Sequence, residues 1–188
     1  MKIKLATITI ALSFIITSFM QQKNKTRPIF EFDKSADISS WKIVNDVVMG
    51  GISNSTISLN SEGFGVFKGN VSTENNGGFA SVRLKLPRFN IHNSTQLKIR
   101  LKGDGKNYQF RLKERSSYYY SYITEFSTSG SWETIIINLN DLYPSFRGRR
   151  LNQDNFDGSS FEELSFLIAN KKSESFILEL DKIELSKN

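Results

Sequence analysis

Apolar and polar residues alternate along most of this chain after residue 28, and this period of two restricts its fold more than any other feature. Successive side chains of a β-strand point to opposite faces, so such runs are typical of half-buried antiparallel strands. Clusters of glycine and asparagine separate the runs, as turns do. The chain therefore predicts an all-β sandwich of the jelly-roll type. The clearest runs are Ala80–Leu86, Leu97–Leu101, Tyr108–Leu112, Leu164–Ile168 and Phe176–Leu180.

Two local departures from this pattern carry further expectations. The alternation that ends at Leu180 resumes out of phase at Ile183, which predicts a β-bulge near Asp181. Ser160–Glu163 is the only segment after residue 28 for which we expect a helical turn.

The first 22 residues have the layout of an export signal. Lys2 and Lys4 precede the apolar run Leu5–Met20, and polar residues follow. We expect either a cleaved signal peptide or an uncleaved N-terminal anchor over residues 1–22, a polar tether over 23–28 and one domain over 29–188. A bacterial protein with this leader is expected to be exported, periplasmic or associated with the envelope.

Composition excludes several classes of function. The chain has no cysteine and one histidine, so disulfides, thiolate metal sites and a cysteine nucleophile are excluded. The histidine, His92, lies in a polar stretch that predicts an exposed loop, and no second histidine supports a metal site. The formal charge is +6, and loss of two lysines with residues 1–20 leaves 23 basic against 19 acidic residues, or +4. Without a dense basic run, nucleic acid is not an expected partner.

Carboxylates offer a weak case for catalysis. Asp46, Asp104, Glu114 and Glu125 could converge as glycosidase acids do, but the sequence gives no reason to pair any two of them. The same scattered acids do not define a calcium site. We predict no catalytic residue, no metal and no cofactor.

The sequence offers stronger candidates for binding than for catalysis. Within Trp41–Ser53, Asp46 stands among apolar residues and must be hydrogen-bonded or bind a ligand, while Gly50 and Gly51 permit close backbone contact. Arg83 and Arg111 fall on the polar sides of their strands, where guanidinium groups can hold carboxylates or hydroxyls. Alternation over 117–126 assigns four rings to one face, as core or as an aromatic platform: Tyr118, Tyr120, Tyr122 and Phe126.

Several ordered motifs together resemble one family, the complex I intermediate-associated protein 30 domain. They are Trp41–Ser53, Asn76–Arg83, Leu101–Gly105 with Tyr108–Arg111, Trp132 with its isoleucines, Asp141–Gly148 and Leu164–Ile168. The resemblance covers roughly residues 29 to 185. It implies a galactose-binding-like jelly roll and a non-enzymatic, chaperone-like role in the assembly of respiratory complex I (NADH:ubiquinone oxidoreductase). Carbohydrate-binding modules share that fold, so glycan binding is the alternative that the resemblance leaves open.

We accordingly predict a binding module for a protein partner, or alternatively an envelope carbohydrate-binding module with Tyr119 or Phe79 against a sugar ring. One edge is expected to combine Trp41–Ser53 with Phe146–Gly148, next to a face with Arg83 and Arg111. The candidate binding residues are Trp41, Asp46, Met49, Gly50, Gly51, Phe79, Arg83, Asp104, Tyr108, Arg111, Phe146 and Arg147.

Overall fold

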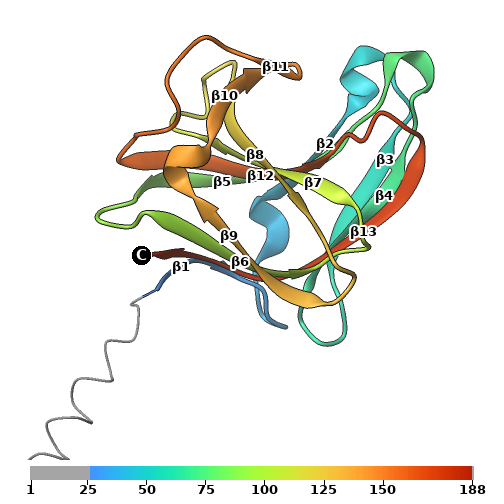
Figure 1. The fold of residues 1–188 in the computed structure, drawn as a ribbon. Helices are drawn as coiled ribbons and strands as arrows, with labels where there is room; N and C mark the ends of the chain where they lie inside the picture. The colour runs from blue at the N-terminus through green and yellow to red at the C-terminus, as the bar shows by residue number, and fades with distance from the viewer. Residues whose placement is uncertain (1–25, 188) are drawn as a thin grey trace, which may run out of the picture.

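Two antiparallel β-sheets packed face to face form the domain in the computed structural model, which describes residues 26–187 (Figure 1). The six-stranded sheet has the order β3 (Asn54–Leu59), β4 (Gly65–Val71), β13 (Glu174–Ser186), β6 (Gln96–Lys102) and β9 (Trp132–Asn138), with β1 (Arg27–Glu31) also paired to β13. The seven-stranded sheet has the order β11 (Arg149–Arg150), β10 (Tyr143–Phe146), β8 (Ser121–Ser127), β7 (Asn107–Lys113), β12 (Ser160–Ile168), β5 (Ala80–Asn90) and β2 (Trp41–Asn45).

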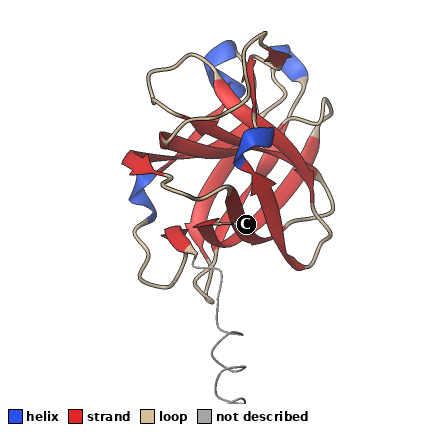
Figure 2. Ribbon diagram, turned by 60° about the vertical axis from the view of Figure 1, so that its left-hand side comes forward, coloured by secondary structure: helices blue, strands red, loops and turns tan. Residues whose placement is uncertain are grey.

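The helical segments of residues 26–187 are single 3₁₀ turns in the connections between strands (Figure 2). They are η1 (Ile38–Ser40), η2 (Asp46–Met49), η3 (Glu74–Asn76) and η4 (Leu139–Asp141). The prediction of an all-β, jelly-roll sandwich is confirmed.

Alternation along the strands separates a core from an outer surface. In β5, Ala80, Val82 and Leu84 are buried between the sheets, whereas Arg83 and Lys85 point away from them. Phe166 of β12 lies at the centre of the core, with ring contacts to Trp41 at 6.4 Å and to Phe110 at 5.8 Å. Complete burial of an aromatic side chain stabilises a fold by about 1.5–3 kcal/mol. Ring contact between the two sheets is made by Tyr108 of β7 and Phe176 of β13, at 6.4 Å.

The expected bulge is present, because the register of β13 against β6 shifts between Leu180 and Lys182. The expected turn at 160–163 is wrong. These residues begin β12, and a register shift against β5 between Phe161 and Glu163 interrupts the period that would have indicated a strand.

The chain enters the sandwich earlier than the sequence indicates. Arg27 pairs with Leu185 and Pro28 with Glu184, so the last two residues of the expected tether belong to β1. The predicted leader, residues 1–22, lies outside the described residues. Within residues 26–187, no helix has the length and apolar character needed to cross a membrane.

Candidate functional site

The outer face of the seven-stranded sheet, which points away from the core, collects polar side chains from five neighbouring strands. Strand register places these side chains in rows across the sheet. We call the central one the arginine row: from β2 to β10 it contains Lys42, Arg83, Ser165, Arg111, Ile123 and Tyr143. On one side runs a second row, in which Glu163 stands between Lys85 and Lys113.

Residues in the middle of this face are buried. Ser165 is 5% exposed and Glu163 is 4% exposed, although both alternate with the core residues of β12 and face away from the core. The longer side chains of Arg83 and Arg111, which are half-buried, flank Ser165 and shield it. The short Ser165 side chain of β12 therefore lies between two arginines.

The guanidinium of Arg111 lies in an unfavourable electrostatic environment. Its burial and the repulsion from Arg83 lower the pKa of its guanidinium, while the charge of Glu163 acts in the opposite direction. Its Nε is buried and has no hydrogen-bond partner among residues 26–187. Burial likewise lowers the pKa of Lys113, whose Nζ donates to the Tyr118 carbonyl at 2.6 Å. A buried donor without an acceptor is costly, so the Nε of Arg111 destabilises the domain, while guanidinium groups in general can hold carboxylates.

Exposed aromatic side chains border one end of the face. Tyr119, in the β7–β8 loop, is 61% exposed, and its ring meets Phe146 edge to face at 5.1 Å. The guanidinium of Arg147 lies 5.3 Å from the Phe146 ring. The strand begins only at Ser121, so Tyr118 and Tyr120 lie in the loop. The rings of Tyr118, Tyr120 and Tyr122 still contact one another in turn, at 5.4 and 5.5 Å. Tyr122 and Phe126 are core residues and Tyr120 packs against the core, as one of the two expected alternatives had it.

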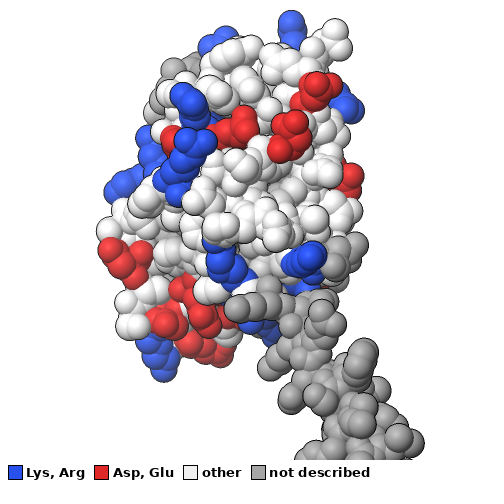
Figure 3. All heavy atoms as spheres, turned by 90° about the vertical axis from the view of Figure 1, so that its left-hand side faces the viewer, with Lys and Arg blue, Asp and Glu red and all other residues white. Residues whose placement is uncertain are grey.

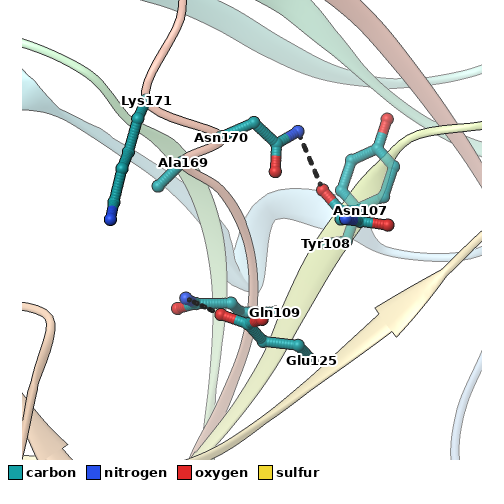
Figure 4. A pocket seen from close by; sticks show the side chains of 7 residues that line it. All are labelled: Asn107, Tyr108, Gln109, Glu125, Ala169, Asn170 and Lys171. Atoms are coloured by element: carbon teal, nitrogen blue, oxygen red, sulfur yellow. Dashed lines mark hydrogen bonds between the residues drawn. The ribbon is translucent and has the colours of Figure 1, made fainter.

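A polar pocket of about 240 Å³ lies at the other end (Figure 4). Gln109 donates to Glu125 at 3.0 Å on its floor, and Asn170 donates to the Asn107 carbonyl at 3.2 Å on its wall. The Lys171 side chain lies across the opening from Asn107 (Figure 4). Amide and carboxylate groups of this kind can hydrogen-bond hydroxyl or amide groups of a ligand.

Asp46 belongs to a closed structural clasp. Its carboxylate is fully buried and accepts hydrogen bonds from the backbone N–H of Ser53, Gly78 and Phe79, at 3.1, 2.6 and 3.1 Å, and from the Ser53 hydroxyl at 2.5 Å. Burial raises the pKa of Asp46, but these hydrogen bonds together outweigh it and lower the pKa below the usual carboxyl value. A Cβ at Gly51 would lie 2.3 Å from the carboxylate. The loop thus requires glycine here for close packing.

Asp104 and Tyr108 form a second clasp. The Asp104 carboxylate accepts from the Tyr108 hydroxyl at 2.9 Å, from Lys106 at 2.6 Å and from the Ile177 backbone N–H at 3.0 Å. Burial, followed by the negative charge of Asp104, raises the pKa of Tyr108. These residues join β7 to β13 and hence one sheet to the other.

These contacts correct several predicted binding residues. The side chains of Trp41 and Asp46 are buried in the core and in a clasp, so they do not offer a surface to a partner. Tyr108 is buried as well, although it is among the residues that line the polar pocket. Gly50, with φ of 89°, ends η2, and the Phe79 backbone completes the Asp46 clasp. The side chain of Met49 lies outside the part of the chain that the structure describes.

The expected common edge is also wrong. Trp41–Asn45 forms one edge strand of the seven-stranded sheet, whereas Phe146–Gly148 lies at the opposite edge. The structure does bring Arg83 and Arg111 together on the face between these edges, as expected. His92 is exposed in its loop, again as expected.

Comparison with known proteins decides the family. A model of the family described as "Complex I intermediate-associated protein 30 (CIA30)" matches residues 30–180. The chain belongs to the CIA30 family. None of the curated proteins compared with it matches.

Solved structures similar to this CIA30 domain establish its fold. The family 11 carbohydrate-binding module of the Clostridium thermocellum cellulase Lic26A-Cel5E has a TM-score of 0.63 at 15% identity, over 89% of this chain and 97% of that chain. The same organism's family 11 module in complex with a β-1,3-1,4-mixed-linked tetrasaccharide gives 0.60 at 15% identity, over 86% and 95%. The agarase AgWH50C gives 0.58 at 14% identity, over 87% of this chain but 24% of its own. At such identities the likeness shows a galactose-binding-like jelly roll and nothing about the ligand.

Sequence reasoning missed Glu163, Ser165 and Tyr143 of this CIA30 domain. The expected turn at 160–163 concealed Glu163, and only strand register places Tyr143 beside Ile123 in the arginine row. The polar residues Glu163 and Ser165, alternating with core residues of β12, were the available signal.

Proposed function

We propose that this CIA30 domain is a non-enzymatic binding module that holds a protein partner on the outer face of its seven-stranded sheet. The family description points to an assembly intermediate of respiratory complex I as that partner. The arginine row is the observation that supports the proposal most. It sets Arg83 and Arg111, without ion pairs among residues 26–187, on a rigid sheet.

The dimensions of the face favour a macromolecular ligand. The arginine row crosses six strands, and at about 4.8 Å per strand spacing its length is about 24 Å. The pocket at one end has a volume of about 240 Å³, below the range of about 300–1,000 Å³ typical of small-molecule sites. A protein segment or a polymer chain lying across the strands fits such a face better than a small metabolite does.

A non-enzymatic role agrees with the state of the carboxylates. Asp46 and Asp104, two of the acids considered for catalysis, hold clasps together and are unavailable to a substrate. Among residues 26–187, no group of three or more histidine, aspartate or glutamate side chains could hold a metal ion.

The second candidate is a carbohydrate-binding module of the cell envelope. Tyr119 favours it, because an exposed ring beside Phe146 and Arg147 could stack on a sugar while nearby polar groups hold its hydroxyls. The likeness to carbohydrate-binding modules supplies a fold compatible with this role.

The predicted export leader restricts the first candidate. A protein outside the cytoplasmic membrane can reach the membrane arm of complex I but not the peripheral arm on the other side. We propose membrane-arm subunits or their assembly intermediates as the partners, captured near the membrane surface.

A cross-linked pull-down of the full chain, tagged at its C-terminus and expressed in its native host, tests both candidates. Mass spectrometry should find complex I membrane-arm subunits with the unaltered protein and lose them with Arg83→Ala/Arg111→Ala. Lys68→Ala, an exposed change on β4 of the other sheet, is the control and should leave capture intact.

Enrichment of envelope glycan-utilisation proteins without complex I subunits would overturn the assembly role. Calorimetry against a polysaccharide panel would then test the second candidate. Saturable binding that Tyr119→Ala abolishes would support it, and a flat response across the panel would reject it.

A further inference from the structure

Five ion pairs within 4 Å occur among residues 26–187, and most arginines and lysines there, Lys68 and Lys98 of the six-stranded sheet included, form none. Ion pairs on the six-stranded sheet include Arg100–Asp181 at 3.0 Å and Lys102–Glu179 at 3.1 Å. No ion pair within 4 Å involves the cations of the two rows on the outer face, among the residues that the structure describes. These unpaired cations are Lys42, Arg83, Lys85, Arg111 and Lys113.

Charge on these rows is strongly unbalanced. Five cations share the two rows with one carboxylate, that of Glu163, which stands between Lys85 and Lys113 and one row from Arg111. The side of the molecule drawn in Figure 3 shows basic and acidic groups with uncharged surface between them. Positive charge thus predominates in these two rows, whereas the next row of the same face, Leu167, Gln109 and Glu125, carries a carboxylate.

The spacing of Arg83 and Arg111 also suits them to bind an anionic group together. Arg83 and Arg111 are separated by one strand, so their Cα atoms are about 10 Å apart, with Ser165 between them. Arg111 also has its buried, unpartnered Nε. A carboxylate between the two side chains could accept two parallel hydrogen bonds from a guanidinium and a third from the Ser165 hydroxyl.

We propose that the occupant of the outer face is an acidic peptide segment of the partner protein, with a carboxylate held between Arg83 and Arg111 above Ser165. This inference rests on the proposed function and adds the chemistry of the partner. A peptide segment is favoured over an acidic polysaccharide because the family description names a protein assembly, whereas the polysaccharide reading rests on the fold alone.

Fluorescence anisotropy with the purified full chain tests this chemistry. The probe is a labelled ten-residue peptide of alternating glutamate and serine, and the matched probe has glutamine for glutamate. We expect the glutamate peptide to bind about tenfold or more tighter, and raising the salt from 50 to 300 mM should weaken it markedly.

Three variants locate the interaction. Arg83→Ala/Arg111→Ala should weaken glutamate-peptide binding about tenfold or more, which corresponds to about 1.4 kcal/mol. Arg111→Lys keeps the charge but loses the planar pair of donors, so it should weaken binding as well. Lys68→Ala/Lys98→Ala removes two charges from the other sheet and should leave binding unchanged, with circular dichroism confirming the fold of every variant.

The outcomes separate this inference from the proposed function. Equal binding of both peptides, or equal binding by the double arginine variant, overturns the acidic-peptide assignment. If that happens while the pull-down still depends on Arg83 and Arg111, the proposed function stands with a different ligand chemistry. Polygalacturonate bound about tenfold or more tighter than the peptide, per charged group, overturns the assignment in favour of an acidic glycan.

Discussion

Arg83 and Arg111 lie in one register row of the seven-stranded sheet, on either side of Ser165, and neither forms an ion pair with any of residues 26–187. The arrangement costs stability, because the Nε of Arg111 is buried without a hydrogen-bond partner among these residues and the two guanidinium groups repel each other. Such a cost is expected where a site is prepared for a ligand. The relationship therefore separates residues that hold the domain together from residues that stand ready to bind.

Asp46→Asn should destabilise the domain by about 2–4 kcal/mol at pH 7, because an amide cannot accept all four hydrogen bonds that the carboxylate receives. Urea unfolding followed by tryptophan fluorescence measures the loss. The control is Asp154→Asn, an exposed aspartate, which should change stability by less than about 0.5 kcal/mol. Equal effects of the two substitutions would contradict the structural role of Asp46.

At acid pH the wild type and Asp46→Asn should differ less in their free energy of unfolding than they do at pH 7. Since the pKa of Asp46 is lowered on folding, its stabilisation is complete above the unfolded-state value of about 3.9 and is lost as the pH falls through the folded-state pKa. The stability gap should hold from pH 7 to about pH 4 and close below it. Urea unfolding at intervals from pH 7 to pH 2 measures the gap, and a gap independent of pH would contradict the assignment.

Gly51→Ala should destabilise the domain through the same clasp, because the added Cβ would meet the Asp46 carboxylate. The two substitutions should be non-additive by about 1 kcal/mol or more, since each disturbs the same contacts. Urea unfolding of the wild type, Gly51→Ala, Asp46→Asn and the double variant gives the four free energies of this double-mutant cycle. Simple additivity would show that Gly51 acts independently of Asp46.

The sequence predicted the sandwich well because alternation is a local signal that each strand carries by itself. It marked Asp46 as a residue that must be hydrogen-bonded or bind a ligand, but could not choose between the two. Two of the four donors, Gly78 and Phe79, lie more than 30 residues away along the chain, and only the pairing of β2 with β5 brings them near.

The face was harder to predict than the fold. Arg83 and Arg111 were identified from alternation within single strands, whereas the rows that join them to Ser165 and Tyr143 depend on register between strands. Glu163 was not identified, because the register shift between Phe161 and Glu163 interrupts the alternation there and a helical turn was expected instead of a strand. Local patterns thus show which side of a strand a residue occupies, but not its neighbour across the sheet.

Tyr108→Phe should lower the stability of the domain and leave capture of the partner unchanged, whereas Tyr119→Ala should leave the stability nearly unchanged. Tyr108→Phe removes the hydroxyl that donates to Asp104 and should cost about 1 kcal/mol of stability without a direct effect on ligand binding. Tyr119→Ala removes an exposed ring and should change stability by less than about 0.5 kcal/mol. Thermal unfolding measures the stability of each variant, and pull-down yield measures its binding. A large stability loss in Tyr119→Ala would indicate that its contact with Phe146 is structural.

Arg111→Met should stabilise the isolated domain while abolishing capture of the partner. Methionine keeps much of the apolar stem that packs beside Ile123, and it removes both the buried unpartnered Nε and the repulsion from Arg83. Replacement of buried charge by apolar groups is often stabilising, so we expect a gain of about 1 kcal/mol, read as a higher midpoint in urea.

The matched change Arg100→Met removes an arginine that pairs with Asp181 on the other sheet, and it should be neutral or slightly destabilising with capture retained. A destabilised Arg111→Met would mean that Glu163 depends on Arg111 for its burial, because Lys85 and Lys113 would then fail to compensate that carboxylate. The arginine row would in that case be part of the folding core of the sheet, and the separation of binding residues from structural residues would not hold at Arg111.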